Sequence, residues 1–369
     1  MKTEESNIFF RGKLQSGTIS FHEGVIDRVK IRGPGKEGLP YLFPGFIDIH
    51  VHGSCGHDFL SGGKSYEAIS RCLPRNGVTS FMPTFAAAPV ETFHAAISAY
   101  AGSRCDGADP FAIHLEGPFI NPAMSGAQNP EFMRPPDIGE LMEYVTRSMG
   151  RIGLVTVAPE LPGAKELIQA SVRRSISCSI GHTVATYEQA AESFGWGVTI
   201  VNHSYNAMTP FHHRKPGVVG AMLLSKGVFC ELIADGIHVS ADAVRLLLKN
   251  VGAERIVLIT DGIMAQNGPD GHYETEAFAF DVNNGIARLA DGALAGSTLT
   301  MDNAMKNMVS MTSLPLEKVV PMLTSIPARA AGLTDRGELE TGRRADMVML
   351  DRNLGVTQTF VAGRSVYSR

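Results

Sequence analysis

The sequence predicts an α/β protein: a (β/α)8 TIM-type barrel with a small β-sandwich domain that the N- and C-terminal segments form together. Two observations lead to this fold class. From residue 45 to residue 261, eight short apolar runs alternate with stretches of helical periodicity, which is typical of βα units around a parallel sheet. Both ends of the chain carry strand and turn signals instead. A doubly wound open sheet is the runner-up, but no Gly-x-Gly-x-x-Gly turn follows the first run, which weakens it.

The barrel strands are predicted from apolar runs and the helices from the periodic stretches between them. The eight strands are expected at Gly45–His52, Gly77–Phe85, Pro110–Glu116, Arg151–Pro159, Ser175–His182, Gly197–His203, Val228–His238 and Arg255–Asp261. The helices are expected at Tyr66–Arg75, Val90–Ala101, Ile138–Ser148, Ala164–Arg174, Thr186–Phe194, Gly217–Ser225, Ala241–Asn250 and Thr300–Thr312, with one or two more in Leu316–Gly332. The long loop before residue 300 holds two short β-like pieces, Ala277–Asp281 and Ile286–Ala290.

The two ends of the chain read as short strands joined by turns. The expected strands are Ile8–Leu14, Gly17–Phe21, Val25–Ile31, Arg344–Asp351, Val356–Val361 and Ser365–Ser368. Each end is too small to fold alone, so we expect both to pair in one sheet domain. The predicted boundaries are 1–42 and 335–369 for the small domain and 43–334 for the barrel.

The composition is that of a globular protein with no nucleic-acid or membrane partner. The chain has 369 residues, 44% of them hydrophobic, and a formal net charge of -4 with scattered basic residues, so no basic patch is expected. The first twenty residues contain no apolar core of signal-peptide length. The five cysteines are dispersed and without Cys-x-x-Cys spacing, which favours a reducing compartment over a disulfide framework. We therefore expect a cytoplasmic protein.

Metal-competent side chains gather at the expected strand ends. His50 and His52 close the first strand, and side chains two residues apart on a strand share a face. Alone, this pair is as well explained by two surface histidines as by a metal site. Other such side chains end the third, fifth, sixth, seventh and eighth strands: Glu116, His182, His203, His238 and Asp261. Because a barrel carries its chemistry at this edge, the set as a whole predicts a metal centre.

Other candidates keep two interpretations. His114 precedes Glu116 by two residues and either coordinates a metal or supports a ligand from inside the barrel. His212 and His213 lie in a loop where solvent exposure competes with substrate contact. The fourth strand carries no lysine, and Lys165 falls in a helical stretch, so Glu116 is the available bridging oxygen ligand. His22, His57, His94 and His272 are expected to be ordinary surface or loop histidines.

Several motifs together resemble one family. They are Pro44-Gly-Phe-Ile-Asp-Ile-His-Val-His52, His114-Leu-Glu-Gly-Pro, Gly181-His-Thr, His203-Ser-Tyr-Asn-Ala-Met, Arg214-Lys-Pro-Gly, Ala234-Asp-Gly-Ile-His238, Ile259-Thr-Asp261 and Leu294-Ala-Gly-Ser-Thr. The match runs nearly end to end and resembles the amidohydrolase superfamily, more narrowly its N-acetylglucosamine-6-phosphate deacetylases. The His-x-His pair is shared across the superfamily, whereas the His-Leu-Glu-Gly-Pro and His-x-Tyr-Asn-Ala-Met motifs are highly specific.

The resemblance implies a role for each motif residue. Glu116, His182 and His203 would hold the principal divalent metal, and His50 and His52 a second one near Asp261. Zinc is expected first, with iron, cobalt or manganese as alternatives, and Asp261 would be the general base and acid. The implied substrate-binding residues are Ala127, Gln128, Asn206, Ala207, Arg214, His238, Leu294, Ala295 and Gly296, with Arg214 near the phosphate.

The implied reaction is hydrolysis of the acetamide of N-acetyl-D-glucosamine 6-phosphate, by a homodimer. Gln128 stands where many members place a histidine, so its part in polarising the carbonyl is open. The galacto epimer remains an alternative substrate, because the loop around Arg214 also resembles that branch. A cyclic amidohydrolase would normally carry a lysine after the fourth strand, and a non-catalytic barrel would have lost ligands. Neither interpretation suits this sequence.

Overall fold

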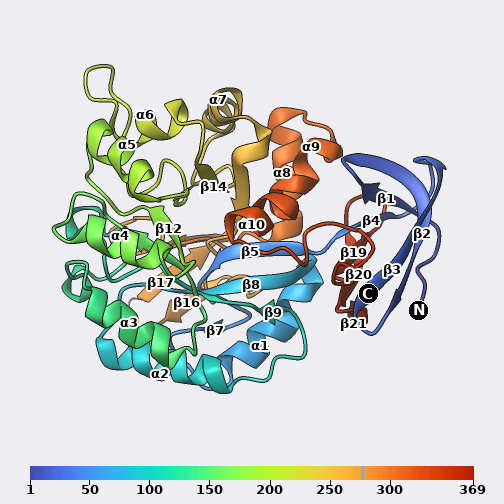
Figure 1. The fold of residues 1–369 in the computed structure, drawn as a ribbon, viewed down its shortest axis with the longest axis horizontal. Helices are drawn as coiled ribbons and strands as arrows, with labels where there is room; N and C mark the ends of the chain where they lie inside the picture. The colour runs from blue at the N-terminus through green and yellow to red at the C-terminus, as the bar shows by residue number, and fades with distance from the viewer. Residues whose placement is uncertain (276–278) are drawn as a thin grey trace.

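The computed structural model describes residues 1–275 and 279–369 as a barrel with a small sheet domain at its side (Figure 1). Eight parallel strands pair in chain order. They are β5 (Phe46–Val51), β8 (Val78–Phe85), β10 (Ile113–Leu115), β11 (Ile152–Val157), β12 (Ser177–Ile180), β13 (Ile200–Val201), β14 (Phe229–Ile233) and β15 (Ile256–Ile259). The short strand β9 (Asp109–Pro110) also pairs with β8.

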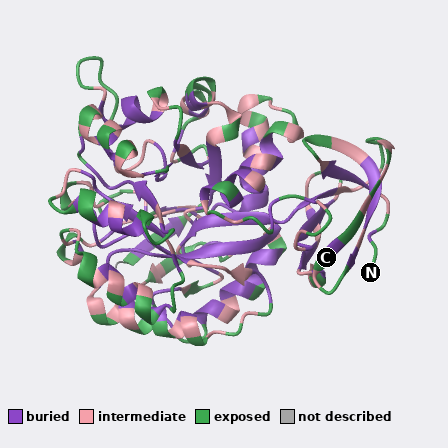
Figure 2. Ribbon diagram, in the orientation of Figure 1, coloured by how far each residue is buried: buried purple, intermediate pink, exposed green. Residues whose placement is uncertain are grey.

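The barrel closes where the first and last strands end. The backbone N–H of Asp261 donates to the His50 carbonyl at 2.9 Å, and that of His52 donates to the Gly262 carbonyl at 2.7 Å. These bonds join β15 to β5 and exclude the open doubly wound sheet. All residues of β5 and β8 are buried, as the purple strands of Figure 2 show. Burial on both faces explains why these strands are continuous apolar runs in the sequence.

Helices surround the barrel where the periodic stretches predicted them. They are α1 (Ser65–Cys72), α2 (Val90–Gly102), α3 (Ile138–Arg147), α4 (Ala164–Val172), α5 (Tyr187–Trp196), α6 (Gly217–Leu224), α7 (Ala241–Val251), α8 (Met301–Thr312), α9 (Leu316–Leu323) and α10 (Ser325–Ala330). Capping residues set several boundaries. Thr186 and Gln189 form a capping box at the start of α5, and Gly197 ends that helix with φ 118°. No described helix has the length and apolar character needed to cross a membrane.

Both ends of the chain contribute to one seven-stranded sheet, as predicted. Its order is β21 (Arg364–Ser368), β20 (Val356–Val361), β19 (Met347–Leu350), β4 (Tyr41–Pro44), β1 (Ser6–Phe10), β2 (Lys13–His22) and β3 (Val25–Pro34). The sheet folds over its own core, because the rings of Phe21 in β2 and Phe360 in β20 lie 5.9 Å apart, centroid to centroid. The domain boundaries after residues 42 and 334 stay predictions.

Two details of this sheet differ from the sequence expectation. Ile8–Leu14 is not one strand, because Arg11 and Gly12 both have positive φ and form the β1–β2 turn. Strand β4 was not predicted, since its four residues run into the apolar barrel strand with only Gly45 between them. It pairs in parallel with β1 and antiparallel with β19, and so connects the two ends of the chain.

A three-stranded sheet follows the last barrel strand. It consists of β16 (Gly271–Glu274), β17 (Ala279–Asn283) and β18 (Ile286–Arg288). Its own apolar cluster contains Phe280, Val282 and Ala287 together with Ile263 and Ala295 from the barrel rim. Of the predicted piece Ala277–Asp281, residues 277 and 278 lie outside the described residues and the remainder belongs to β17. The other piece corresponds to β18.

The cysteine expectation is wrong for one pair. Cys55 and Cys72 form a disulfide across 17 residues of sequence, whereas Cys105, Cys178 and Cys230 are free. The first βα unit brings this pair together, because Cys55 lies in the loop after β5 and Cys72 ends α1. Such a contact depends on packing, and cysteine spacing alone does not reveal it.

Candidate metal centre and active site

Two groups of ligand side chains meet at the carboxyl ends of the barrel strands. The first contains Glu116, His182 and His203, which follow β10, β12 and β13. The second contains His50, His52 and Asp261, at the ends of β5 and β15. Within each group the candidate ligand atoms all lie within 4.8 Å of one another. The structure therefore brings together every metal ligand predicted from the sequence.

The backbone is left-handed at two of the strand ends that carry site residues. His182 and Asp261 adopt left-handed conformations, with φ of 46° and 48°. A non-glycine residue in such a conformation typically costs about 1–3 kcal/mol, and such residues cluster at functional sites.

Glu116 belongs to the first group and also contacts the two histidines of the second. Its Oε1 is 3.2 Å from His182 Nε2, 3.0 Å from His203 Nε2 and 3.2 Å from His50 Nε2. Its Oε2 is 3.2 Å from His52 Nε2. A carboxylate placed in this way can give one oxygen to each of two cations, which agrees with its predicted bridging position.

Three of the four histidines are anchored through their far ring nitrogen. His182 Nδ1 lies 2.8 Å from the Met124 carbonyl, and His203 Nδ1 lies 3.2 Å from the Asn206 carbonyl. A carbonyl can only accept, so both rings donate from Nδ1, and the neutral form of each ring offers its Nε2 lone pair on the side of Glu116. His50 Nδ1 lies 3.0 Å from Oε2 of the Glu231 carboxylate. Convergent, oriented imidazoles are the usual pattern around a protein-bound transition metal.

The electrostatics of the cluster favour a cation. Burial by itself lowers the pKa of both His50 and His52, but the surrounding carboxylates, Glu116 first among them, together outweigh it. The pKa of His50 is raised well above its usual value, and that of His52 rises to about 9. Conversely, burial would raise the pKa values of Glu116 and Asp261, but the neighbouring histidines lower both. The residues therefore fit a divalent metal in donor type, orientation and charge.

His114 belongs to neither ligand group. Its ring lies inside the barrel, 4.8 Å from the His50 ring between centroids. Its Nδ1 is 3.3 Å from Thr84 Oγ1, and its Nε2 is 2.7 Å from Thr156 Oγ1. Burial lowers its pKa well below the usual value. Of the two interpretations of this residue, the structure supports the one in which it packs beneath a ligand.

A cavity of about 250 Å³ opens over the two ligand groups. Most of the predicted substrate-binding residues line it: Ala127, Gln128, Asn206, Ala207, His238, Leu294 and Gly296. Ala295 does not, because it is fully buried in the cluster behind the wall. Sequence reasoning missed Asp58, a charged residue of this lining. It also missed uncharged lining residues that had given no signal in the sequence: Leu60, Ala86, Gly126, Ile263, Thr275 and Ala293.

Two polar side chains of the wall are held firmly. Gln128 donates from Nε2 to Glu116 Oε2 at 2.9 Å and accepts the Ala87 N–H at 2.6 Å. His238 Nδ1 lies 2.6 Å from Asp235 Oδ2. Burial opposes a charge on His238, but Asp235 outweighs it and raises the pKa of the imidazole. Asp235 was not predicted, although it lies within the motif that ends in His238.

Arg214 is not brought into this cavity. It lies in an exposed segment, 209–216, that projects from the barrel between α5 and α6 (Figure 1). Its Nη1 donates to His213 Nε2 at 2.8 Å. Among the described residues that line the cavity there is no lysine or arginine. A single copy of the chain therefore leaves the predicted phosphate contact unmade.

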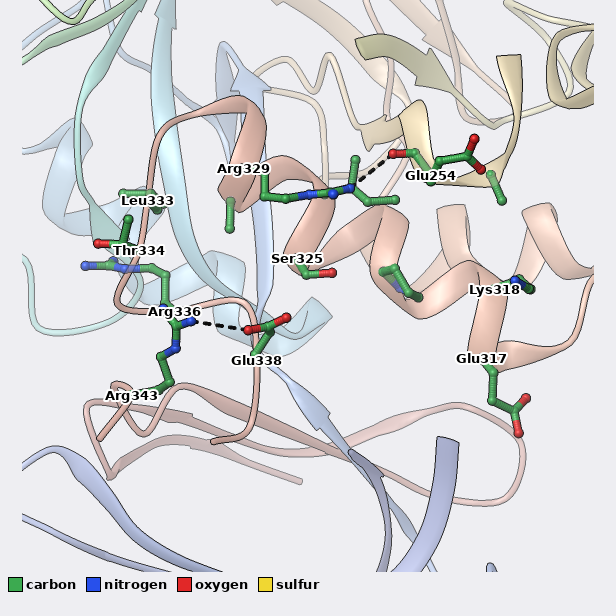
Figure 3. Close-up of a pocket in the computed structure, with 14 residues that line it drawn as sticks. Glu254, Glu317, Lys318, Ser325, Arg329, Leu333, Thr334, Arg336, Glu338 and Arg343 are labelled. Carbon is green, nitrogen blue, oxygen red and sulfur yellow. Dashed lines mark hydrogen bonds and ion pairs between the residues drawn. The ribbon is translucent and has the colours of Figure 1, made fainter. Parts of the chain in front are cut away.

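A larger cavity, of about 490 Å³, lies at the opposite end of the barrel, between α9, α10 and residues 333–343. Figure 3 shows Arg329 donating to the backbone carbonyl of Glu254, and Arg343 paired with Glu338. Within the described parts of the chain, neither group of potential metal ligands lies here. Its size alone gives it no chemistry, so the smaller cavity is the candidate active site.

A barrel that gathers two such ligand groups beneath a cavity defines a metal-dependent hydrolase of the barrel class. Comparison with known proteins refines this class. The model of the amidohydrolase family matches residues 41–366. The chain is 38% identical to an N-acetylgalactosamine-6-phosphate deacetylase of Escherichia coli O157:H7, over 88% of this chain and 87% of that protein. It is 35% identical to an N-acetylglucosamine-6-phosphate deacetylase of Lysinibacillus sphaericus, over 98% and 94%.

A solved structure gives the same result. An N-acetyl-D-glucosamine-6-phosphate deacetylase variant from Mycobacterium smegmatis, in complex with N-acetyl-D-glucosamine-6-phosphate, superposes with a TM-score of 0.92 at 32% identity. The alignment covers 99% of this chain and 98% of that one. The chain thus belongs to the amidohydrolase family, in its branch of N-acetylglucosamine-6-phosphate deacetylases. The family predicted from the motifs is confirmed.

Proposed function

We propose that this protein hydrolyses the acetamide of N-acetyl-D-glucosamine 6-phosphate to glucosamine 6-phosphate and acetate, using one or two divalent metal ions. The observation that carries the proposal is the meeting of the two ligand groups at the base of the cavity, with Glu116 of the first group in contact with His50 and His52 of the second. A divalent metal held by Glu116, His182 and His203 would lower the pKa of a water molecule from 15.7 to about 7 and polarise a carbonyl.

The protein side chains would carry the proton transfers. Asp261 follows β15, and its Oδ1 lies 3.2 Å from His52 Nε2, so its carboxylate faces the reacting end of the cavity. It takes the proton of the attacking water and returns that proton to the departing sugar nitrogen. His238 or the amide of Gln128 donates to the acetyl oxygen as negative charge develops there. One such donor is typically worth about 3 kcal/mol of barrier.

The metal and its setting are proposed from ligand chemistry. Imidazole and carboxylate donors suit zinc, and they also suit iron, cobalt and manganese, so zinc is the first candidate. The His50–His52 pair favours a second ion. We propose that the enzyme is cytoplasmic, which is the compartment where we expect its sugar-phosphate substrate.

We further propose a homodimer in which Arg214 of one copy reaches the phosphate bound by the other. The absence of a lysine or arginine from the described lining supports this arrangement, as does the projecting segment that carries Arg214. Phe211 in that segment and Leu224 at the end of α6 are exposed by 59% and 70%, which a second copy would cover. An arginine fork suits bidentate phosphate binding.

Mixed dimers test the cross-subunit contact. Arg214→Ala and Asp261→Asn are each expected to be nearly inactive alone. If Arg214 acts across the interface, a dimer of one subunit of each kind has one complete site, and an equal mixture recovers about a quarter of wild-type activity. An inactive mixture, with mixed dimers demonstrated by two affinity tags, would place Arg214 in its own subunit's site, and an Arg214→Ala variant that is fully active alone would remove it from the reaction.

The galacto epimer is a second candidate substrate, and the 38% identity to an N-acetylgalactosamine-6-phosphate deacetylase favours keeping it. The test is kcat/KM for both 6-phosphates on one preparation of measured metal content. A higher kcat/KM for the gluco epimer supports the proposal. A higher kcat/KM for the galacto epimer would make N-acetyl-D-galactosamine 6-phosphate the substrate instead. A cyclic amidohydrolase gains no support, because β11 ends at Val157 without a following lysine.

A further inference from the structure

Glu231 is a buried carboxylate with no part in the chemistry described so far. It lies in β14 with 0% exposure, between Cys230 and Leu232. It belongs to neither ligand group. No ion pair with a lysine or arginine is found for it within the described residues. A buried acid without a cationic partner is costly to a fold, so its contacts need an explanation.

All side-chain contacts found for this carboxylate are to metal-ligand residues. Its Oε2 lies 3.0 Å from His50 Nδ1 and also accepts the backbone N–H of His203 at 3.2 Å. Its Oε1 has no hydrogen-bond partner in the described part of the protein. One oxygen therefore touches a ligand of each group: the ring of His50 and the backbone of His203.

The contact with His50 decides which ring nitrogen is free. A carboxylate accepts hydrogen bonds, so the Nδ1 that faces Glu231 carries the hydrogen. In the neutral ring that binds a metal, the lone pair then lies on Nε2, the nitrogen that is 3.2 Å from Glu116 Oε1 and 3.3 Å from His52 Nε2. Without the acceptor, the ring could carry its hydrogen on Nε2 and donate to Glu116, and it would then be lost as a ligand.

We infer that Glu231 is a positioning residue that fixes His50 as a ligand and thereby sets whether the His50–His52–Asp261 group holds a divalent metal. This inference rests on the proposed metal-dependent function. It makes metal binding by the second group depend on a residue of β14 that lies on the far side of His50 from the cavity. Partners of this kind are typically worth about 10–100-fold in metal affinity.

The test measures metal binding rather than turnover. Glu231→Leu removes the acceptor at similar size, whereas Glu231→Gln keeps an oxygen that can accept from His50. Zinc is removed, returned by titration against a chromophoric chelator, and counted by elemental analysis. We expect two equivalents in the wild type and in Glu231→Gln. In Glu231→Leu we expect one tight equivalent, with the second bound at least about tenfold more weakly.

Matched variants separate positioning from a general loss of stability. Asp346→Asn changes another buried acid, one paired with Arg344 in the small sheet domain, and should leave both zinc equivalents in place. If Glu231→Leu does not fold, Glu231→Ala is measured in the same way. The inference would be overturned if Glu231→Leu, or Glu231→Ala in its place, bound two zinc equivalents at wild-type affinity. It would also be overturned if the wild type bound a single zinc equivalent at saturating zinc. Failure of the proposed function is a separate result: wild type that releases no acetate.

Discussion

Replacing Asp261 by asparagine should remove most of the catalysis and leave the fold intact. Asparagine tolerates the left-handed backbone at this position, where φ is 48°, and keeps the side-chain volume. The other two carboxylates that line the cavity are engaged elsewhere. Glu116 faces the histidines, and Asp58 accepts the Leu60 N–H at 2.8 Å. Neither can take over the proton transfers from its present contacts.

The expected loss follows from this lack of a substitute base. Positioned acid–base groups contribute about 10²–10⁴-fold, and Asp261 would serve in both directions of transfer. We expect kcat to fall about 10³-fold, which corresponds to roughly 4 kcal/mol of barrier. The assay follows acetate release at saturating substrate, with metal content and thermal unfolding measured on the same samples. A kcat within tenfold of wild type, in a variant that retains its metal, would refute the assigned role of Asp261.

Three further changes test other parts of the structure. His50→Asn combined with His52→Asn should remove one metal equivalent and leave some activity; loss of both equivalents on elemental analysis would reverse the ranking of the two groups. Cys72→Ser should lower the free energy of unfolding by about 3 kcal/mol in oxidising buffer, as expected for a disulfide closing a loop of this size; an equal loss in the presence of reductant would refute the disulfide's role. The raised pKa of His238 stabilises the fold below the unfolded value near 6.5, and this stabilisation fades as pH rises through the folded pKa. Asp235→Asn should therefore destabilise the protein more at pH 6 than at pH 9 in urea unfolding, and a loss independent of pH would contradict this.

The barrel could be predicted because its physical causes are local in the sequence. Strands buried on both faces appear as unbroken apolar runs, and caps such as Thr186 mark where helices begin. The ligands could be predicted for a related reason. A parallel barrel places all its strand ends at one edge, so residues as distant as His50 and Asp261 are adjacent once the strands are counted correctly.

The remaining features depend on contacts that sequence spacing does not encode. Strand β4 is too short to distinguish from the barrel strand that follows it. The pairing of Cys55 with Cys72 depends on how α1 packs against the loop after β5. Glu231 reads as an interruption of an apolar strand until its position behind His50 is seen. Arg214 was predicted from resemblance, and the structure of one chain leaves it exposed and outside the cavity.

The most direct test of the central claim is metal removal and return, with acetate release from N-acetyl-D-glucosamine 6-phosphate as the readout. Purified protein treated with a strong chelator should lose its activity together with its metal. Zinc returned stepwise should restore most of the activity with the first equivalent, because Glu116, His182 and His203 form the group assigned to the chemistry. Full acetate release by protein shown to be free of metal, or none with any divalent ion returned, would contradict the account.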